Sequence, residues 1–80
     1  MLDIFLEGYN AQDKINNPFM WSSDSWLVWD AGFLFGKKGY CQPIKVKKSR
    51  GYSVKVQTHA NDFTIKYDTA TLAKTTIERH

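Results

Sequence analysis

The sequence predicts an α+β fold, in which an N-terminal helical hairpin packs on a three-stranded antiparallel β-meander, with a possible C-terminal helix. The spacing of apolar residues predicts it: they recur every three or four residues in the first half, and from Pro43 onward they alternate with polar residues. Eighty residues suit a single domain, so we expect one unit over 1–80. Within it, 1–40 would form the aromatic hairpin and 41–80 the basic meander and its tail.

The first helix is predicted to run from Leu2 to about Lys14. Its apolar residues recur at helical spacing: Leu2, Phe5, Leu6 and Tyr9. Gly8 lies inside the pattern, three residues before Ala11, and a glycine within a helix usually has a packing reason. The two small residues therefore predict a smooth patch that another backbone can approach closely.

The second helix is predicted over Asp24 to Phe35, after a turn at Pro18. The stretch "SSDS" supplies side chains that can cap its first turn. Trp26, Trp29 and Phe33 would form one stripe along it. Gly36 is predicted to end the helix, followed by the two lysines Lys37 and Lys38, which suit the negative end of the helix dipole.

Three strands are predicted in "IKVKK", "GYSVKVQT" and "DFTIKYD", with turns at "KSRG" and "HAND". One face would be apolar: Ile44, Val46, Tyr52, Val54, Val56, Phe63, Ile65 and Tyr67. The other face would be polar: Lys45, Lys47, Ser53, Lys55, Gln57, Thr64 and Lys66. In the tail "TATLAKTTIERH", Asp68 or Thr69 could cap a helix, while the threonines also permit a fourth strand, and we predict the helix.

Catalytic and metal-binding signatures are absent from the sequence. Cys41 is the single cysteine, which excludes an internal disulfide and suits a reducing compartment, and His59 and His80 form no nucleophile or zinc motif with it. "GFLFGKKG" lacks the glycine spacing and the Ser or Thr of a phosphate-binding loop. No apolar run approaches about 20 residues, and no basic leader precedes the first apolar residues. We therefore expect a cytoplasmic protein that is no enzyme, has no cofactor or metal and does not enter a membrane.

Charge is divided unevenly along the chain. Residues 1–40 carry five acidic and three basic side chains, a net of −2, whereas residues 41–80 carry three acidic and eight basic ones, a net of +5. Such asymmetry is typical of proteins that bind nucleic acid or another anionic surface. Six basic residues are the candidate contacts: Lys45, Lys47, Lys48, Arg50, Lys55 and Lys66. The alternative is a solvated face that resists aggregation, and binding there would depend on charge and shape because no aromatic side chain interrupts the face.

The aromatic residues of the second helix indicate a core, but apolar side chains surround that helix almost completely. Any part that the first helix and the sheet leave uncovered would be a docking surface or a dimer interface. Trp21 lies outside the tryptophan stripe and is the ring expected to face a partner, with Lys37 and Lys38 as further candidates. The sequence leaves the oligomeric state open.

Three short motifs in the first half suggest a family: "EGYNAQ", "NNPF" and "WDAGF". Over about residues 6–37 the chain resembles the bacterial ribosome modulation factor family, and similar small proteins occur in phage genomes. The resemblance implies a helical hairpin and binding to the small ribosomal subunit. The chain departs from the family in its net negative hairpin, its shorter spacer before Asn17 and its strand-rich second half, so any RNA contacts would have moved to the sheet.

Together these observations predict a small non-catalytic protein that contacts RNA through the basic sheet face, with the ribosome as the first candidate. One alternative is a phage-type inhibitor or adaptor that binds a host protein through exposed aromatic residues. Another is a module whose sheet enters the major groove of DNA.

Overall fold

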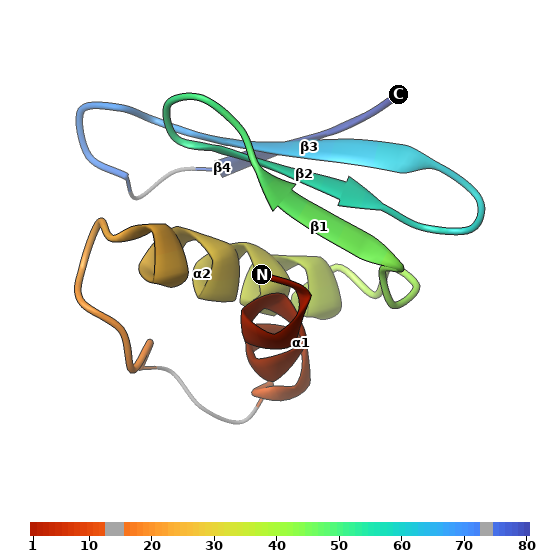
Figure 1. Cartoon of the computed structure of the whole chain (residues 1–80), viewed down its shortest axis with the longest axis horizontal. Helices are drawn as coiled ribbons and strands as arrows, with labels where there is room; N and C mark the ends of the chain where they lie inside the picture. Colours follow the sequence, from red (N-terminus) through yellow and green to blue (C-terminus); the bar gives the residue numbers. More distant parts are fainter. Residues whose placement is uncertain (13–15, 73–74) are drawn as a thin grey trace.

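The computed structural model describes residues 1–12, 16–72 and 75–80. Over these residues the chain forms two helices and four strands: α1 (Leu2–Asn10), α2 (Asp24–Lys37), β1 (Lys45–Lys48), β2 (Ser53–Gln57), β3 (Asp62–Tyr67) and β4 (Thr75–Arg79). The strands form one sheet in the order β1-β2-β3-β4, with each neighbouring pair antiparallel. Both helices lie on the same side of this sheet, with α2 next to it (Figure 1). The predicted α+β class is confirmed.

The alternating pattern places apolar side chains between the sheet and the helices. In the register, Val46 lies opposite Val56 and Val54 lies opposite Ile65, and all four are buried. Ile44 was predicted to share this face, but 45% of its surface is exposed. It lies before the first residue of β1, and the preceding Pro43 is buried in its place.

The C-terminal tail forms a strand, so the predicted C-terminal helix and the three-stranded sheet are wrong. β4 pairs with β3, and Ile77 lies opposite Ile65. The β-branched run Thr75–Ile77 fits a pleated strand better than a helix, and its pairing covers an edge of β3 that would otherwise be open. In the preceding turn the Asp68 carboxylate accepts a hydrogen bond from the backbone N–H of Ala70 at 2.7 Å. Residues 73–74 of the predicted helix lie outside the described residues.

The start of α2 follows the prediction and its end does not. The Ser23 hydroxyl oxygen accepts a hydrogen bond from the backbone N–H of Trp26 at 3.1 Å, which is the expected cap. The helix continues to Lys37, so Gly36 lies inside it. Gly39 instead adopts the left-handed conformation just beyond the helix, with φ 79°.

The first helix is shorter than expected, because α1 ends at Asn10 and the predicted helix ran to about Lys14. Residues 13–15 of that prediction lie outside the described part of the chain. The predicted close approach of the two helices is confirmed. A Cβ atom on Gly8 would overlap the carbonyl oxygen of Trp29, and one on Gly32 would overlap that of Phe5. Both obstacles are backbone atoms, so only glycine fits either position without moving a helix.

The core joins the helix pair to the sheet through aromatic rings. Phe35 of α2 is fully buried. Its ring centroid lies 5.5 Å from that of Phe5, 4.8 Å from that of Tyr40 and 5.1 Å from that of Phe63. These rings come from α1, the segment after α2, and β3, so one side chain connects three parts of a small protein.

Candidate nucleic-acid interface

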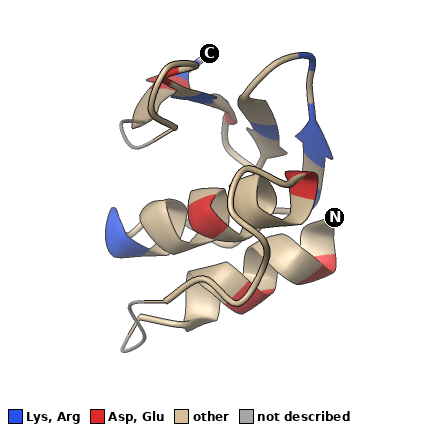
Figure 2. Cartoon of the chain, turned by 90° about the vertical axis from the view of Figure 1, so that its left-hand side faces the viewer, with Lys and Arg blue, Asp and Glu red and all other residues tan. Residues whose placement is uncertain are grey.

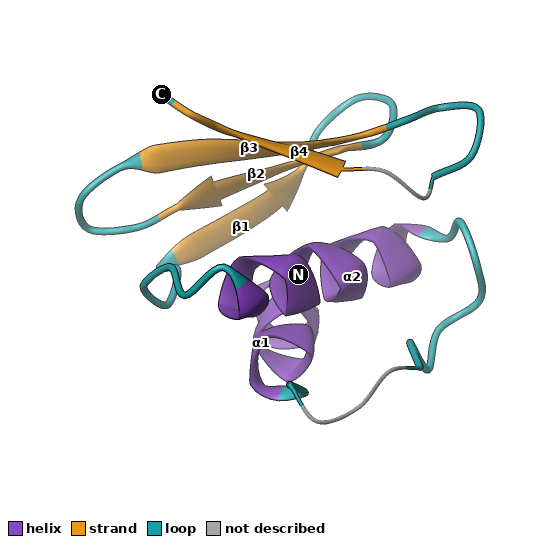
Figure 3. Cartoon of the chain, turned by 180° about the vertical axis from the view of Figure 1, so that it is seen from behind, coloured by secondary structure: helices purple, strands orange, loops and turns teal. Residues whose placement is uncertain are grey.

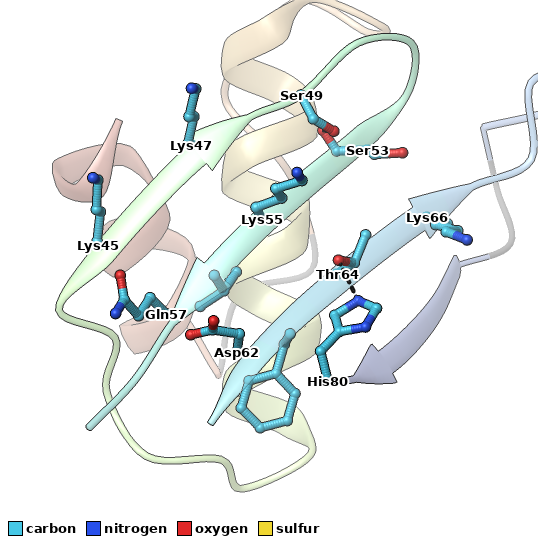
Figure 4. A pocket seen from close by; sticks show the side chains of 12 residues that line it. Lys45, Lys47, Ser49, Ser53, Lys55, Gln57, Asp62, Thr64, Lys66 and His80 are labelled. Carbon is cyan, nitrogen blue, oxygen red and sulfur yellow. Dashed lines mark hydrogen bonds between the residues drawn. The ribbon is translucent and has the colours of Figure 1, made fainter. Parts of the chain in front are cut away.

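The face of the sheet away from the helices carries the polar residues of the strand alternation. Figure 3 shows that neither helix covers this side. We call it the outer face and define it by Lys45, Lys47, Ser53, Lys55, Gln57, Asp62, Thr64 and Lys66, whose side chains lie together in Figure 4. A hollow of about 620 Å³ lies over these residues. The outer face on β1 to β3 therefore carries four lysines and one aspartate.

Three of these lysines form a group that we call the lysine cluster: Lys45 and Lys47 on β1 and Lys55 on β2. Lys47 lies directly opposite Lys55 in the register. All three side chains are exposed, and none forms a salt bridge with a described residue. Like charges directly opposite each other destabilise an antiparallel pair. An anion over the cluster would relieve this repulsion.

The structure separates the other three predicted nucleic-acid contacts from the cluster. Lys66 shares the outer face, but its ammonium lies 3.1 Å from the Glu78 carboxylate. Lys48 is half-buried, and its ammonium lies 3.4 Å from the carboxylate of Asp24 at the start of α2. Arg50 is exposed in the turn between β1 and β2. The uncompensated positive charge of the predicted set thus lies mainly in the lysine cluster.

Two contributors to the outer face were missed by sequence reasoning. The ring Nε2 of His80 lies 2.8 Å from the hydroxyl oxygen of Thr64, and His80 lies beside β3 in Figure 4. Glu78, the ion-pair partner of Lys66, lies opposite Thr64 on β4. Both residues belong to the tail that was predicted as a helix. The β-branched residues of that tail were the signal that could have placed them.

The residues predicted to bind a partner protein lie at opposite ends of α2. Trp21 precedes the helix and is 60% exposed. Lys37 and Lys38 are exposed at its C-terminal end. Because a helix of 14 residues is about 21 Å long, these three residues do not form one surface.

No family model, curated protein or solved structure matches the chain. The likeness to the ribosome modulation factor family therefore rests on the three sequence motifs alone. Within residues 1–12, 16–72 and 75–80, no helix is long and apolar enough to cross a membrane. The same residues include no group of three or more His, Cys, Asp or Glu side chains that could hold a metal ion.

A half-buried carboxyl group lies on the other side of the molecule, on α2. Oδ2 of Asp30 accepts a hydrogen bond from the Tyr67 hydroxyl at 3.0 Å, and that hydroxyl also lies 3.2 Å from the carbonyl oxygen of Leu27. Burial raises the pKa of Asp30 above its usual value of 3.8, and the hydrogen bond from Tyr67 opposes this shift. Burial also raises the pKa of Tyr67, and the charge of Asp30 raises it further. The hydroxyl therefore stays protonated and remains a donor.

Asp30 should make the free energy of unfolding decrease as the pH rises above about 4. Its folded pKa is raised, so its stabilising contribution is fully present below the unfolded pKa and is lost as the pH rises through the folded pKa. Asp30→Asn should flatten this part of the profile and increase the stability at neutral pH relative to the wild type. Urea unfolding at a series of pH values measures the effect.

The exposed Asp3 on α1 provides the control for this measurement, since Asp3→Asn removes the same charge outside buried surroundings. A stability profile that Asp30→Asn leaves unchanged would contradict the expected role of burial.

Proposed function

We propose that the protein is a non-catalytic binding protein that holds the phosphate backbone of RNA on its outer face. The observation that carries the proposal is the pairing of Lys47 opposite Lys55, with no acidic partner in the described part of the chain. Such a pair lowers the stability of the sheet. Phosphate groups above the cluster would offset this cost and would release counterions on binding.

The shape of the outer face favours a polymer over an enclosed small molecule. The hollow lies over an open sheet, and Lys45 and Lys47 emerge on the same side of β1, about 7 Å apart along the strand. The face also lacks an aromatic residue at its outward positions on β1 to β3. Base stacking is therefore not expected, and binding should depend on charge and salt more than on sequence.

Ribosomal RNA is the first candidate for the ligand. The hairpin motifs resemble those of the ribosome modulation factor family, and the positive charge has its main concentration on the added sheet. We place the protein in the cytoplasm, where ribosomes are present and where the exposed free thiol of Cys41 would stay reduced.

Salt-dependent binding to a single-stranded RNA about 12 nucleotides long tests the proposal. Three lysine contacts at about 0.7 each predict a slope near −2 when the logarithm of the association constant is plotted against that of the salt concentration. The double variant Lys47→Gln/Lys55→Gln should reduce the slope to about −0.7 and weaken binding at least about tenfold at low salt. Fluorescence anisotropy measures both quantities.

The matched control is Lys37→Gln/Lys38→Gln, which removes the same charge from exposed lysines at the end of α2. It should leave the slope unchanged. Equal loss in both double variants, or no salt-dependent association in the wild type, would overturn the proposal. Tighter binding to duplex DNA of the same length would favour the DNA-binding alternative, and co-sedimentation with ribosomes, lost in the cluster variant, would support the ribosomal source.

A further inference from the structure

A second hollow, of about 450 Å³, lies beside α2 and the segment that precedes it. We call it the aromatic groove and define it by the residues that the argument uses: Phe19, Trp21, Trp26, Trp29, Asp30 and Phe33. It is lined from α2 and the segment before it, whereas the lysine cluster lies on β1 and β2. The two sites therefore use different parts of the chain.

Four of the five aromatic rings of the groove are arranged in two pairs. The centroids of Trp21 and Trp26 lie 6.1 Å apart with their planes at 59°, and those of Trp29 and Phe33 lie 5.7 Å apart and stacked. Trp21 is exposed, Trp26 is half-buried and Trp29 is almost fully buried, so the groove reaches from solvent to the core. The faces of aromatic rings carry partial negative charge, and tryptophan attracts cations most strongly.

A carboxyl group completes the lining of the groove. Asp30 accepts one hydrogen bond through Oδ2, from Tyr67, and forms no salt bridge with any described basic residue. Its burial disfavours the charged form, which raises its pKa. A cation that entered the groove would contact the aromatic faces and would also supply a counter-charge that no described basic residue gives Asp30.

The charge on the groove side of the molecule is negative, as the binding of a cation requires. Figure 2 shows acidic segments on both helices, and of the two acidic residues of α2, Asp24 is paired with Lys48, whereas Asp30 lies in the lining of the groove. Lys37, the last residue of α2, and the following Lys38 lie at the far end of the helix, about 10 Å or more from Asp30 along the helix axis. Negative potential on this side would attract a basic partner.

We propose that the aromatic groove binds an arginine side chain of a partner protein. The guanidinium group is planar, stacks on aromatic faces and is more weakly hydrated than an ammonium group, so it enters a ring-lined groove at lower cost. Its several N–H donors can reach the Asp30 carboxylate while its plane lies against a tryptophan. This site is separate from the outer face proposed to bind RNA, and its partner would carry the opposite charge to RNA.

Titration with a short blocked peptide that contains one arginine tests the inference, with the three tryptophan indole N–H signals followed by NMR. The matched probe contains citrulline, which has the same shape without the charge. We expect saturable shifts at Trp26 and Trp29 with a dissociation constant on the order of 1 mM, as suits a single side chain. The citrulline peptide should bind at least about tenfold more weakly.

Two variants locate the binding site. Asp30→Asn keeps an acceptor for Tyr67 and should weaken arginine binding at least about fivefold, while Asp3→Asn removes an equal charge outside the groove and should leave it unchanged. Trp21→Ala should also weaken binding without unfolding the protein, because that ring is 60% exposed. Equal binding of the arginine and citrulline peptides, equal binding of a lysine peptide, or wild-type affinity in Asp30→Asn would overturn the inference. Loss of RNA binding alone would contradict only the proposed function.

Discussion

Gly32→Ala is expected to destabilise the protein by about 3 kcal/mol or more and to leave much of it unfolded at room temperature. The added Cβ would overlap the backbone carbonyl of Phe5, which cannot rotate away as a side chain could. The helices would have to separate, and the contacts around the buried Phe35 would loosen with them. Alanine favours a helix over glycine by about 1 kcal/mol, which is too little to compensate. Urea unfolding followed by circular dichroism measures the loss.

Gly39→Ala is the matched control for this substitution. A Cβ there meets nothing within 4 Å, and the only penalty comes from the left-handed backbone at φ 79°, which costs about 1–2 kcal/mol. Gly8→Ala should behave like Gly32→Ala, because its Cβ would overlap the carbonyl of Trp29. If Gly32→Ala cost no more than Gly39→Ala, the close contact between the helices would not be needed for folding.

The sequence predicts the packing of the helices and the first three strands because these features depend on local spacing. Gly8 interrupts a helical pattern where a packing contact explains a glycine, and the structure places the backbone of α2 against it. Alternation placed Val54 and Val56 inside, as observed. The tail was ambiguous because Asp68 or Thr69 could cap a helix, while the threonines also permit a strand. The β-branched residues favoured the strand, but its register against β3 depends on a contact that spacing within the tail does not reveal.

The candidate site was predictable to a similar extent. Alternation identified Lys47 and Lys55 on one face. It also indicated that Lys48, two residues after Val46, points to the side of the sheet that the helices cover. The ion pair of Lys66 with Glu78 could not be predicted, because it requires the fourth strand. The hydrogen bond between Asp30 and Tyr67 joins residues 37 positions apart, and no local pattern indicates it.

Lys55→Glu is expected to stabilise the protein and to weaken RNA binding strongly. The substitution turns the repulsive pair with Lys47 into an attractive one across the strands, which should raise the free energy of unfolding by about 0.5 kcal/mol. The same change places a negative charge in the middle of the lysine cluster. It should weaken binding to single-stranded RNA by more than about tenfold at low salt. Urea unfolding and anisotropy on the same preparation measure the two effects.

The opposite signs of these two effects distinguish a functional face from a solvated one. A face that served only to resist aggregation would gain stability from Lys55→Glu, but there would be no binding to lose. Lys37→Glu makes the same charge change at the end of α2 and should weaken RNA binding only slightly, since Lys37 lies outside the hollow. RNA binding of wild-type affinity in Lys55→Glu would exclude the lysine cluster as the site. A stability gain together with loss of binding would mean that the chain keeps a repulsive pair at this position because the ligand requires it.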